Sequence, residues 1–480
     1  MSLSERVIKS GIWLQSAKLV QLAVSFFITA VLARLLSPGD YGLVGIVTVY
    51  ANFISIFTMV GFGSAIIQKQ DISQTQLSTL YWLNILMGLL SMGVIGGSAG
   101  LAARFYGYPE LAPLVRLSSL NFLLIPLYQL HRRMLEKDLQ FPLLSRIDVV
   151  TGLLSGMAGI TCAYLGLGAF SLVVQSLCLN LFSLISIRLS RPWQPDCCFR
   201  LAEVKEMVFF ALKMKGAQLS RYFEKDIDML ILGKSLSARG FGFYSLANRI
   251  VFFPIRRVAY TFTEILFPSL SKIQAEIGKI RLIYLKTIQI IAIFIFPFIL
   301  LITLYARPLV VFSLGTAWKD ASPIIAILSL VGAIQCIEHI SVAIYPAINQ
   351  PGVSMRLGMI RLLTIGTAAY IGGHYGVLGA ATAVLTAKCL LFWVSLSWLK
   401  RYLHYSYRDI WASLYGPVLG SLAMVGLSII LPAGEHPSVL GLLAIMAGQL
   451  LLYGGVILVF NLKDLRYFFQ RLRPGLKGGR

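Results

Sequence analysis

The sequence carries little charge for its length. Only 13% of its 480 residues are charged, whereas 57% are hydrophobic, and the mean hydropathy is +0.77. A soluble domain has roughly 25% charged residues. This composition excludes an ordinary soluble protein and indicates a chain whose solvent is a lipid bilayer.

Sequence motifs typical of enzymes and metalloproteins are also missing. The chain has no Walker loop, no cluster of Cys and His ligands and no spaced nucleophile and base, so we expect no metal, no cofactor and no enzymatic activity. The N-terminus leads into a long apolar helix without a small-residue cleavage site, which argues against a cleaved signal peptide. The six cysteines lack the spacing of metal ligands, so we interpret them as small core residues. They lie at positions 162, 178, 197, 198, 336 and 389.

Long apolar runs recur along the whole chain. Uncharged stretches cover residues 287–306, 411–434 and 437–462, and the Gly166-Leu167-Gly168 turn divides another apolar stretch into two spans. About 20 apolar residues suffice for a helix to cross a hydrocarbon core of about 30 Å. Counting such runs predicts an all-α, polytopic membrane protein with about 14 transmembrane helices.

The charge that is present is mostly basic, with a formal net charge of +22. With Met1 placed inside, 25 of the 42 Lys and Arg residues fall in cytoplasmic connections and 7 in external ones. This asymmetry follows the positive-inside rule and predicts a multi-pass membrane protein with both termini cytoplasmic. The basic excess therefore serves topology and attraction to anionic membrane lipid, and no nucleic acid partner is expected.

A short element occurs twice in the sequence. Residues 36–43, LSPGDYGL, return two hundred positions later as LSARGFGF at 236–243. Six helices in each half is an even number, so both halves should enter the membrane in the same direction and enclose a central cleft. The expected parts are two parallel-repeat six-helix bundles, two additional helices and a basic cytoplasmic tail, at 1–200, 201–403, 404–462 and 463–480.

Four segments carry a resemblance to a known family. They are the amphipathic first helix, the Leu35–Gly42 turn, the Leu266–Lys272 segment and the Gly315–Lys319 segment. With them the sequence resembles colanic-acid-type polysaccharide exporters of the multidrug/oligosaccharidyl-lipid/polysaccharide exporter superfamily. The resemblance implies a flippase of the bacterial inner membrane that moves an undecaprenyl-diphosphate-linked oligosaccharide by alternating access, for exopolysaccharide, capsule or O-antigen synthesis. It also implies a functional monomer that could act beside polysaccharide polymerase machinery.

Ten basic residues lie within the predicted spans, where a charge usually faces a partner or a wet cavity. Because the repeat makes helices one and seven, and two and eight, equivalent, their charges should converge on the cleft. Guanidinium groups bind phosphate oxygens in pairs, which suits a diphosphate-linked lipid. The substrate-binding candidates are Lys18, Lys213, Lys215, Arg221, Lys225, Arg249, Arg256 and Arg257.

Acidic residues and one histidine at span depth could instead couple transport to H⁺ or Na⁺. Internal pairing, for example of Arg221 and Lys225 with Glu224 and Asp228, and local polar contacts between helices are the alternatives. The coupling candidates are Asp226, Asp228, Glu264, Glu338 and His339, with Arg361 and Lys388 on nearby predicted helices.

Two other functions remain open at this point. A relative of the same superfamily could carry lipid II or a small cationic drug, although an apolar or acidic cleft would be expected for the drug. A membrane enzyme of glycan assembly would need a sizeable external loop with catalytic residues, and every predicted external connection is short.

Overall fold

The structure is a computed structural model in which helices alternate with short connections. It describes residues 20–58, 62, 66, 71–274, 276–431 and 438–472. Within these ranges, side chains are described except those of residues 213–225, 253–254, 256–265, 267–269, 342–343, 351 and 462–472. The described residues form helices and no strand, which confirms the predicted all-α class.

The first part of the chain runs from a helix at Val20–Leu35 to α9. Ser73 caps α4 with a capping box, and left-handed glycines end α5 at Gly107 and follow α8 at Gly166. The helices after Val20–Leu35 are α2 (Pro38–Thr58), α4 (Gln74–Gly97), α5 (Ala99–Tyr106), α6 (Leu111–Ser119), α7 (Asn121–Lys137), α8 (Phe141–Tyr164) and α9 (Phe170–Ser190).

The second part repeats this order of long and short helices. Its α12, α13 and α14 follow one another as α4, α5 and α6–α7 do, and the α15–α16 pair corresponds to α8–α9. Its helices are α10 (Leu201–Ser235), α11 (Ala238–Ser271), α12 (Ile277–Leu304), α13 (Ala306–Leu314), η1 (Thr316–Ala321), α14 (Ser322–Ala347), α15 (Pro351–His374) and α16 (Gly376–Leu403). Two helices follow, α17 (Tyr407–Ile430) and α18 (Val439–Leu472).

Ten helical segments in the described part of the chain are long and apolar enough to cross a membrane. Two of them join neighbouring elements, α6 with α7 and η1 with α14. The helix at Val20–Leu35 is too short by this measure, and α10, α11 and α15 do not appear among the ten. The protein is therefore a multi-span membrane protein, and the count of about 14 spans stays a prediction.

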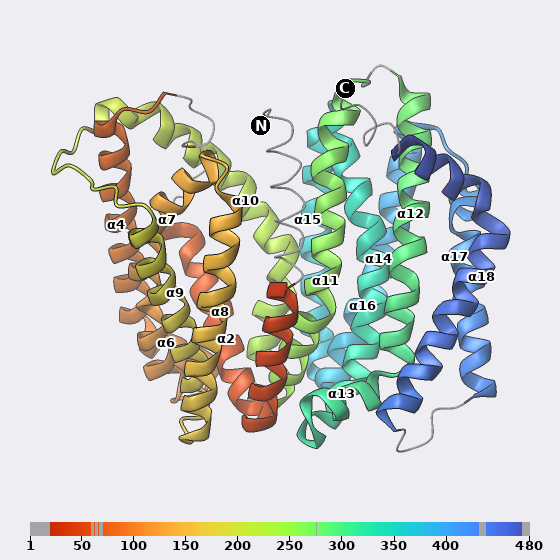
Figure 1. Ribbon diagram of the computed structural model, residues 1–480, viewed down its shortest axis with the longest axis horizontal. Coiled ribbons are helices and arrows are strands. Elements are labelled where there is room, and N and C mark those ends of the chain that lie inside the picture. The colour runs from red at the N-terminus through yellow and green to blue at the C-terminus, as the bar shows by residue number, and fades with distance from the viewer. Residues whose placement is uncertain are drawn as a thin grey trace. The chain divides into compact units, whose positions relative to one another are not determined.

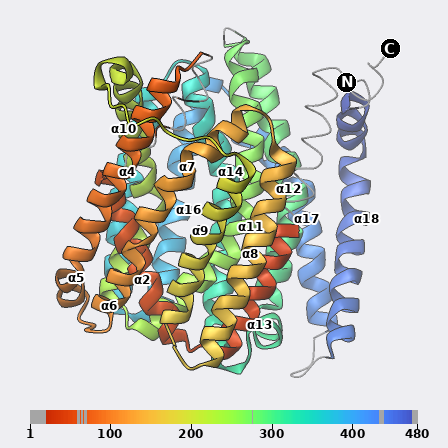
Figure 2. The ribbon, with the colours of Figure 1, turned by 60° about the vertical axis from the view of Figure 1, so that its left-hand side comes forward.

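Contacts divide the chain into two compact units. The first contains residues 1–245 and 313–317, and the second contains 246–312 and 318–480. In the first unit α7 packs against α4 and α9, and α8 packs against α9; in the second unit α14 packs against α12 and α16, and α15 against α16. These neighbours can be followed in both ribbon views (Figure 1 and Figure 2). The unit bounds come from contacts alone, so the predicted repeat bounds remain a prediction.

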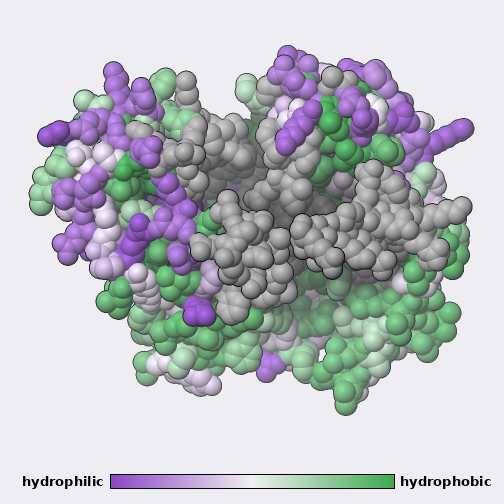
Figure 3. Space-filling model, turned by 45° about the horizontal axis from the view of Figure 1, so that its top comes forward, coloured by the Kyte–Doolittle hydropathy of each residue, from purple (hydrophilic) through white to green (hydrophobic). Residues whose placement is uncertain are grey.

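Apolar side chains cover much of the outside. On the face shown in Figure 3, hydrophobic residues cover most of the lower part and hydrophilic residues gather in the upper part. On α18 the side chains of Leu440, Leu451 and Val459 are among the most exposed. Large apolar surfaces of this kind are avoided by soluble monomers and are what lipid tails would cover.

The two repeat turns contact each other through glycine. A Cβ added to Gly42 would overlap the carbonyl oxygen of Ala238, and one added to Gly242 would overlap that of Pro38. Each added Cβ would also lie 3.1 Å from the amide nitrogen of the other glycine. All of these residues belong to the first unit, and the equivalent positions, Gly42 with Gly242 and Pro38 with Ala238, are two hundred residues apart. The start of α2 therefore crosses the start of α11 at backbone distance, in a reciprocal contact that only glycine permits.

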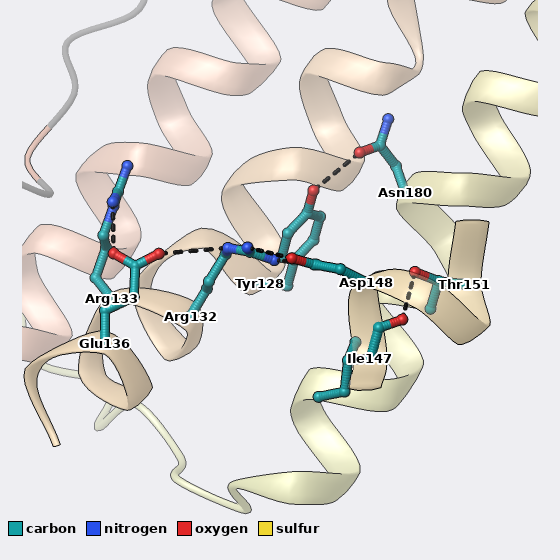
Figure 4. A network of polar contacts seen from close by, with 8 residues as sticks. All are labelled: Tyr128, Arg132, Arg133, Glu136, Ile147, Asp148, Thr151 and Asn180. Carbon is teal, nitrogen blue, oxygen red and sulfur yellow. Dashed lines mark hydrogen bonds and ion pairs between the residues drawn. The ribbon is translucent and has the colours of Figure 1, made fainter. Parts of the chain in front are cut away.

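A polar network joins α7, α8 and α9 within the first unit (Figure 4). Arg132 donates two hydrogen bonds to Asp148, of 2.7 and 2.8 Å, and its Nε lies 3.4 Å from Glu136. Tyr128 donates to the amide oxygen of Asn180 at 2.9 Å. Arg132 therefore neutralises the acidic residue of α8.

We predict that alanine at Gly42 or Gly242 destabilises the protein. The new Cβ meets a backbone carbonyl that can move only if the two helices separate, and overpacking of this kind costs about 1–3 kcal/mol. Gly152, on α8, is the matched control because a Cβ there meets nothing within 4 Å. Thermal unfolding of the purified protein measures the effect, and a Gly42→Ala variant as stable as Gly152→Ala would refute the crossing.

We also predict coupling between Arg132 and Asp148. Removing Arg132 leaves Asp148 without its partner, and removing Asp148 leaves Arg132 with the longer contact to Glu136 alone. Because both side chains are about a quarter exposed, either change should cost about 1–3 kcal/mol. A double-mutant cycle with Arg132→Ala and Asp148→Asn should show a double variant less destabilised than the sum of the singles. Arg146→Ala, at an exposed position of α8, is the control; additive singles would contradict the pairing.

Candidate functional site

Many of the predicted substrate-binding residues lie outside the described side chains. For most of them the structure describes only the backbone, which lies on α10 or α11. Those whose side chains, or whole residues, are outside the description are Lys18, Lys213, Lys215, Arg221, Lys225, Arg256 and Arg257, together with the coupling candidate Glu264. Their roles stay predictions.

Arg249 is the predicted cation whose surroundings are described. It lies on α11, about three turns after the first helical residue, and its side chain is exposed. No ion pair joins it to another residue in the part of the chain that the structure describes. An exposed guanidinium with no ion pair of its own can bind a phosphate oxygen pair without first breaking an internal salt bridge.

Asp228 is held by a tyrosine that the sequence analysis missed. The carboxylate is buried, with 7% of the residue exposed, and it accepts a hydrogen bond of 2.7 Å from the hydroxyl of Tyr244. The tyrosine itself is fully buried on the first turns of α11, so this bond links α10 to α11 within the first unit. Asp226, two positions earlier, is half-buried. The repeat gave no signal for this tyrosine, because the equivalent position of the first copy is Val44.

The repeated turns are built alike around these residues. Asp40 accepts hydrogen bonds from the Ser37 amide at 2.9 Å and the Ser37 hydroxyl at 2.6 Å, which fixes the entry into α2. In both copies the amide three positions after the serine donates to the serine hydroxyl, Asp40 to Ser37 at 3.2 Å and Gly240 to Ser237 at 3.1 Å, and in the second copy a glycine stands where the first has Asp40. Local capping therefore explains why both copies turn at the repeated leucine and serine.

Glu338 lies in a buried cluster in the second unit. Arg361 Nε donates to Glu338 Oε1 at 2.8 Å, and Lys388 Nζ lies 4.0 Å from Glu338 Oε2. The three residues come from α14, α15 and α16, and the neighbouring candidate His339 is half-buried. The cations expected nearby are therefore direct partners of Glu338, as the alternative of a polar contact between helices had proposed. Among the described residues there is no group of three or more His, Cys, Asp or Glu residues that could bind a metal ion.

The overall arrangement is shared with solved transporters. One structure, titled lipid II flippase MurJ in an inward closed conformation, matches with a TM-score of 0.74 at 13% identity, covering 95% of this chain and 99% of that chain. Another, a multidrug resistance MATE family transporter of the MOP superfamily in an inward-facing conformation, matches with a TM-score of 0.62 at 16% identity, covering 80% and 98%. At these identities the likeness establishes the fold alone.

Curated relatives extend the likeness to the sequence. The lipopolysaccharide biosynthesis protein WzxC of Escherichia coli (strain K12) is 26% identical, with 88% of this chain and 87% of that protein covered. The succinoglycan biosynthesis transport protein ExoT of Rhizobium meliloti (strain 1021) is 25% identical, covering 81% and 78%. The teichuronic acid biosynthesis protein TuaB of Bacillus subtilis (strain 168) is 29% identical, covering 60% of each.

The family match covers more than half of the chain and includes both repeated turns. It extends over residues 31–323, from the end of the first described helix to the start of α14. The resemblance inferred from the sequence is thereby confirmed. The chain belongs to the family described as polysaccharide biosynthesis protein.

Proposed function

We propose that the protein is a flippase that moves an undecaprenyl-diphosphate-linked oligosaccharide repeat unit from the cytoplasmic to the outer leaflet. The observation that carries this proposal is the family match, supported by relatives named for lipopolysaccharide, succinoglycan and teichuronic acid synthesis or transport. A fold shared with a lipid II flippase fits the same chemistry. The protein would reside in the inner membrane with both termini cytoplasmic, as its basic residues predict.

Cationic side chains at span depth would bind the diphosphate. A diphosphate carries about two negative charges, and an arginine side chain can donate two parallel hydrogen bonds to one phosphate. The exposed Arg249 supports this role, and the remaining cations of the first, seventh and eighth predicted spans would add to the same binding surface. The polyprenyl tail would stay in the bilayer while the head group crosses.

The energy source would be secondary, because a membrane potential of 100 mV acts on one charge with about 2.3 kcal/mol. Asp228 is the best placed of the acidic candidates for coupling to H⁺ or Na⁺, because Tyr244 connects its carboxylate to α11. A change in the charge of Asp228 would then alter the contact between α10 and α11. Polysaccharide polymerase machinery would receive the flipped unit.

A different cargo is the second candidate. The neighbours of similar fold include both a lipid II flippase and a drug transporter, so the fold cannot choose among cargos. Lipid II also contains a diphosphate, whereas a cationic drug would be repelled by Arg249. Transport of lipid-linked repeat units and lipid II by the purified protein, compared side by side, distinguishes the two lipid cargos.

We predict that Arg249→Ala lowers the rate of repeat-unit transfer at least about tenfold, because hydrogen bonds to a charged group are worth about 1.5–3 kcal/mol. Arg256→Ala should add to this defect. In cells that depend on this protein for polymer export, lipid-linked units should accumulate on the cytoplasmic side while the variant inserts normally in the membrane. The matched control is Arg239→Ala, which removes the same charge from the first turn of the same helix. Equal export by the two variants would remove Arg249 from the substrate site.

A further inference from the structure

The buried cluster of Glu338, Arg361 and Lys388 carries an unbalanced charge. The exposed fractions of the three side chains are 4%, 6% and 10%, in that order. Two cations, Arg361 and Lys388, face the one carboxylate of Glu338. In the described part of the chain no other acidic residue forms an ion pair with either of them. An excess positive charge of this kind is costly at membrane depth unless a further anion compensates it.

One atom of the cluster also lacks a hydrogen-bond acceptor. Arg361 Nη2 is buried and has no hydrogen-bond partner among the described residues, although the Nε of the same guanidinium bonds to Glu338. Leaving a buried charged donor unsatisfied costs more than the 1–3 kcal/mol, approximately, that a neutral group costs. The donor without an acceptor therefore belongs to Arg361, one of the two cations that give the cluster its excess positive charge.

The geometry limits what could meet both needs. The Lys388 ammonium has three donors but lies 4.0 Å from the nearest Glu338 oxygen, so its contact with the carboxylate is loose. All three side chains are at least nine-tenths buried, which leaves no room for a diphosphate with attached sugars. A metal cation would face two positive charges and one negative charge. The net charge of the cluster favours an anion, and the burial of its side chains favours a small one.

We propose that Arg361 and Lys388 bind a small inorganic anion of the halide class, chloride under cellular conditions. The anion would accept the free N–H of Arg361 Nη2, contact the Lys388 ammonium and bring the cluster to electrical neutrality. Because Arg361 lies on α15 and Lys388 on α16, bound chloride would join these two helices. The site is separate from the cations assigned to the lipid-linked substrate and does not depend on which cargo is carried.

A chloride titration of the purified full-length protein tests this site. Ionic strength is held constant with sodium gluconate while sodium chloride or bromide replaces it, and the thermal unfolding midpoint is followed. A ligand that binds only the folded state raises the midpoint in a saturable way. The wild type should show this rise. Lys388→Met should abolish it, whereas Lys388→Arg, which keeps the charge, should retain it.

Two further variants separate specific binding from a general salt effect. Lys279→Met removes an equal charge from the same unit, at a side chain that is 66% exposed and paired with Glu276, and should titrate like the wild type. Glu338→Gln increases the positive excess and should lower the half-saturating chloride concentration about tenfold, for a gain of about 1.4 kcal/mol in binding. If Lys388→Met does not fold, Glu338→Gln and Lys388→Arg still decide the matter. A wild type insensitive to chloride, or equal chloride dependence in Lys388→Met and Lys279→Met, would overturn the proposal.

Discussion

The absence of water from the bilayer interior is the constraint on which this structure depends. A charged or polar group within a span must find its partner inside the protein. Arg132 and Asp148 satisfy each other in the first unit, Tyr244 supports Asp228, and Glu338 holds two cations in the second unit. Arg249 differs from all of these because it is exposed, and this difference makes it available to an anionic cargo.

The glycine crossing shows how duplication produces a close contact. Gly42 and Gly242 occupy the same place in the two copies of the repeated turn, and each approaches the backbone of the other copy. Side chains join this contact, because a Cβ added to Gly45 would lie 2.9 Å from the Phe241 ring. The crossing therefore combines a direct approach of two backbones with packed side chains, all within the first unit.

Much of the fold could be predicted from the sequence, because bilayer thickness and helix rise leave few choices. The apolar runs predicted the helices, and the glycines at 166 and 168 predicted the break between α8 and α9. The number of spans was harder, because α10 and α11 contain many charged residues and do not meet a simple hydropathy criterion.

The candidate site was less predictable than the helices. The pattern of charges located Glu338, Arg361 and Lys388 on nearby helices, but which of them touch depends on how α14, α15 and α16 rotate against one another. The same is true of Tyr244, whose hydroxyl reaches Asp228 only because α10 and α11 pack side by side at their connected ends. Helical periodicity within one span does not contain this information.

Reconstituted transport tests the central claim most directly. The purified protein is placed in liposomes with an undecaprenyl-diphosphate-linked oligosaccharide confined to one leaflet, and a membrane-impermeant glycosidase reports the sugar that reaches the other leaflet. The account predicts transfer well above that of protein-free liposomes and of liposomes that contain the Arg249→Ala variant. Transfer by the wild type no faster than in protein-free liposomes, with the protein shown to be folded, would contradict it.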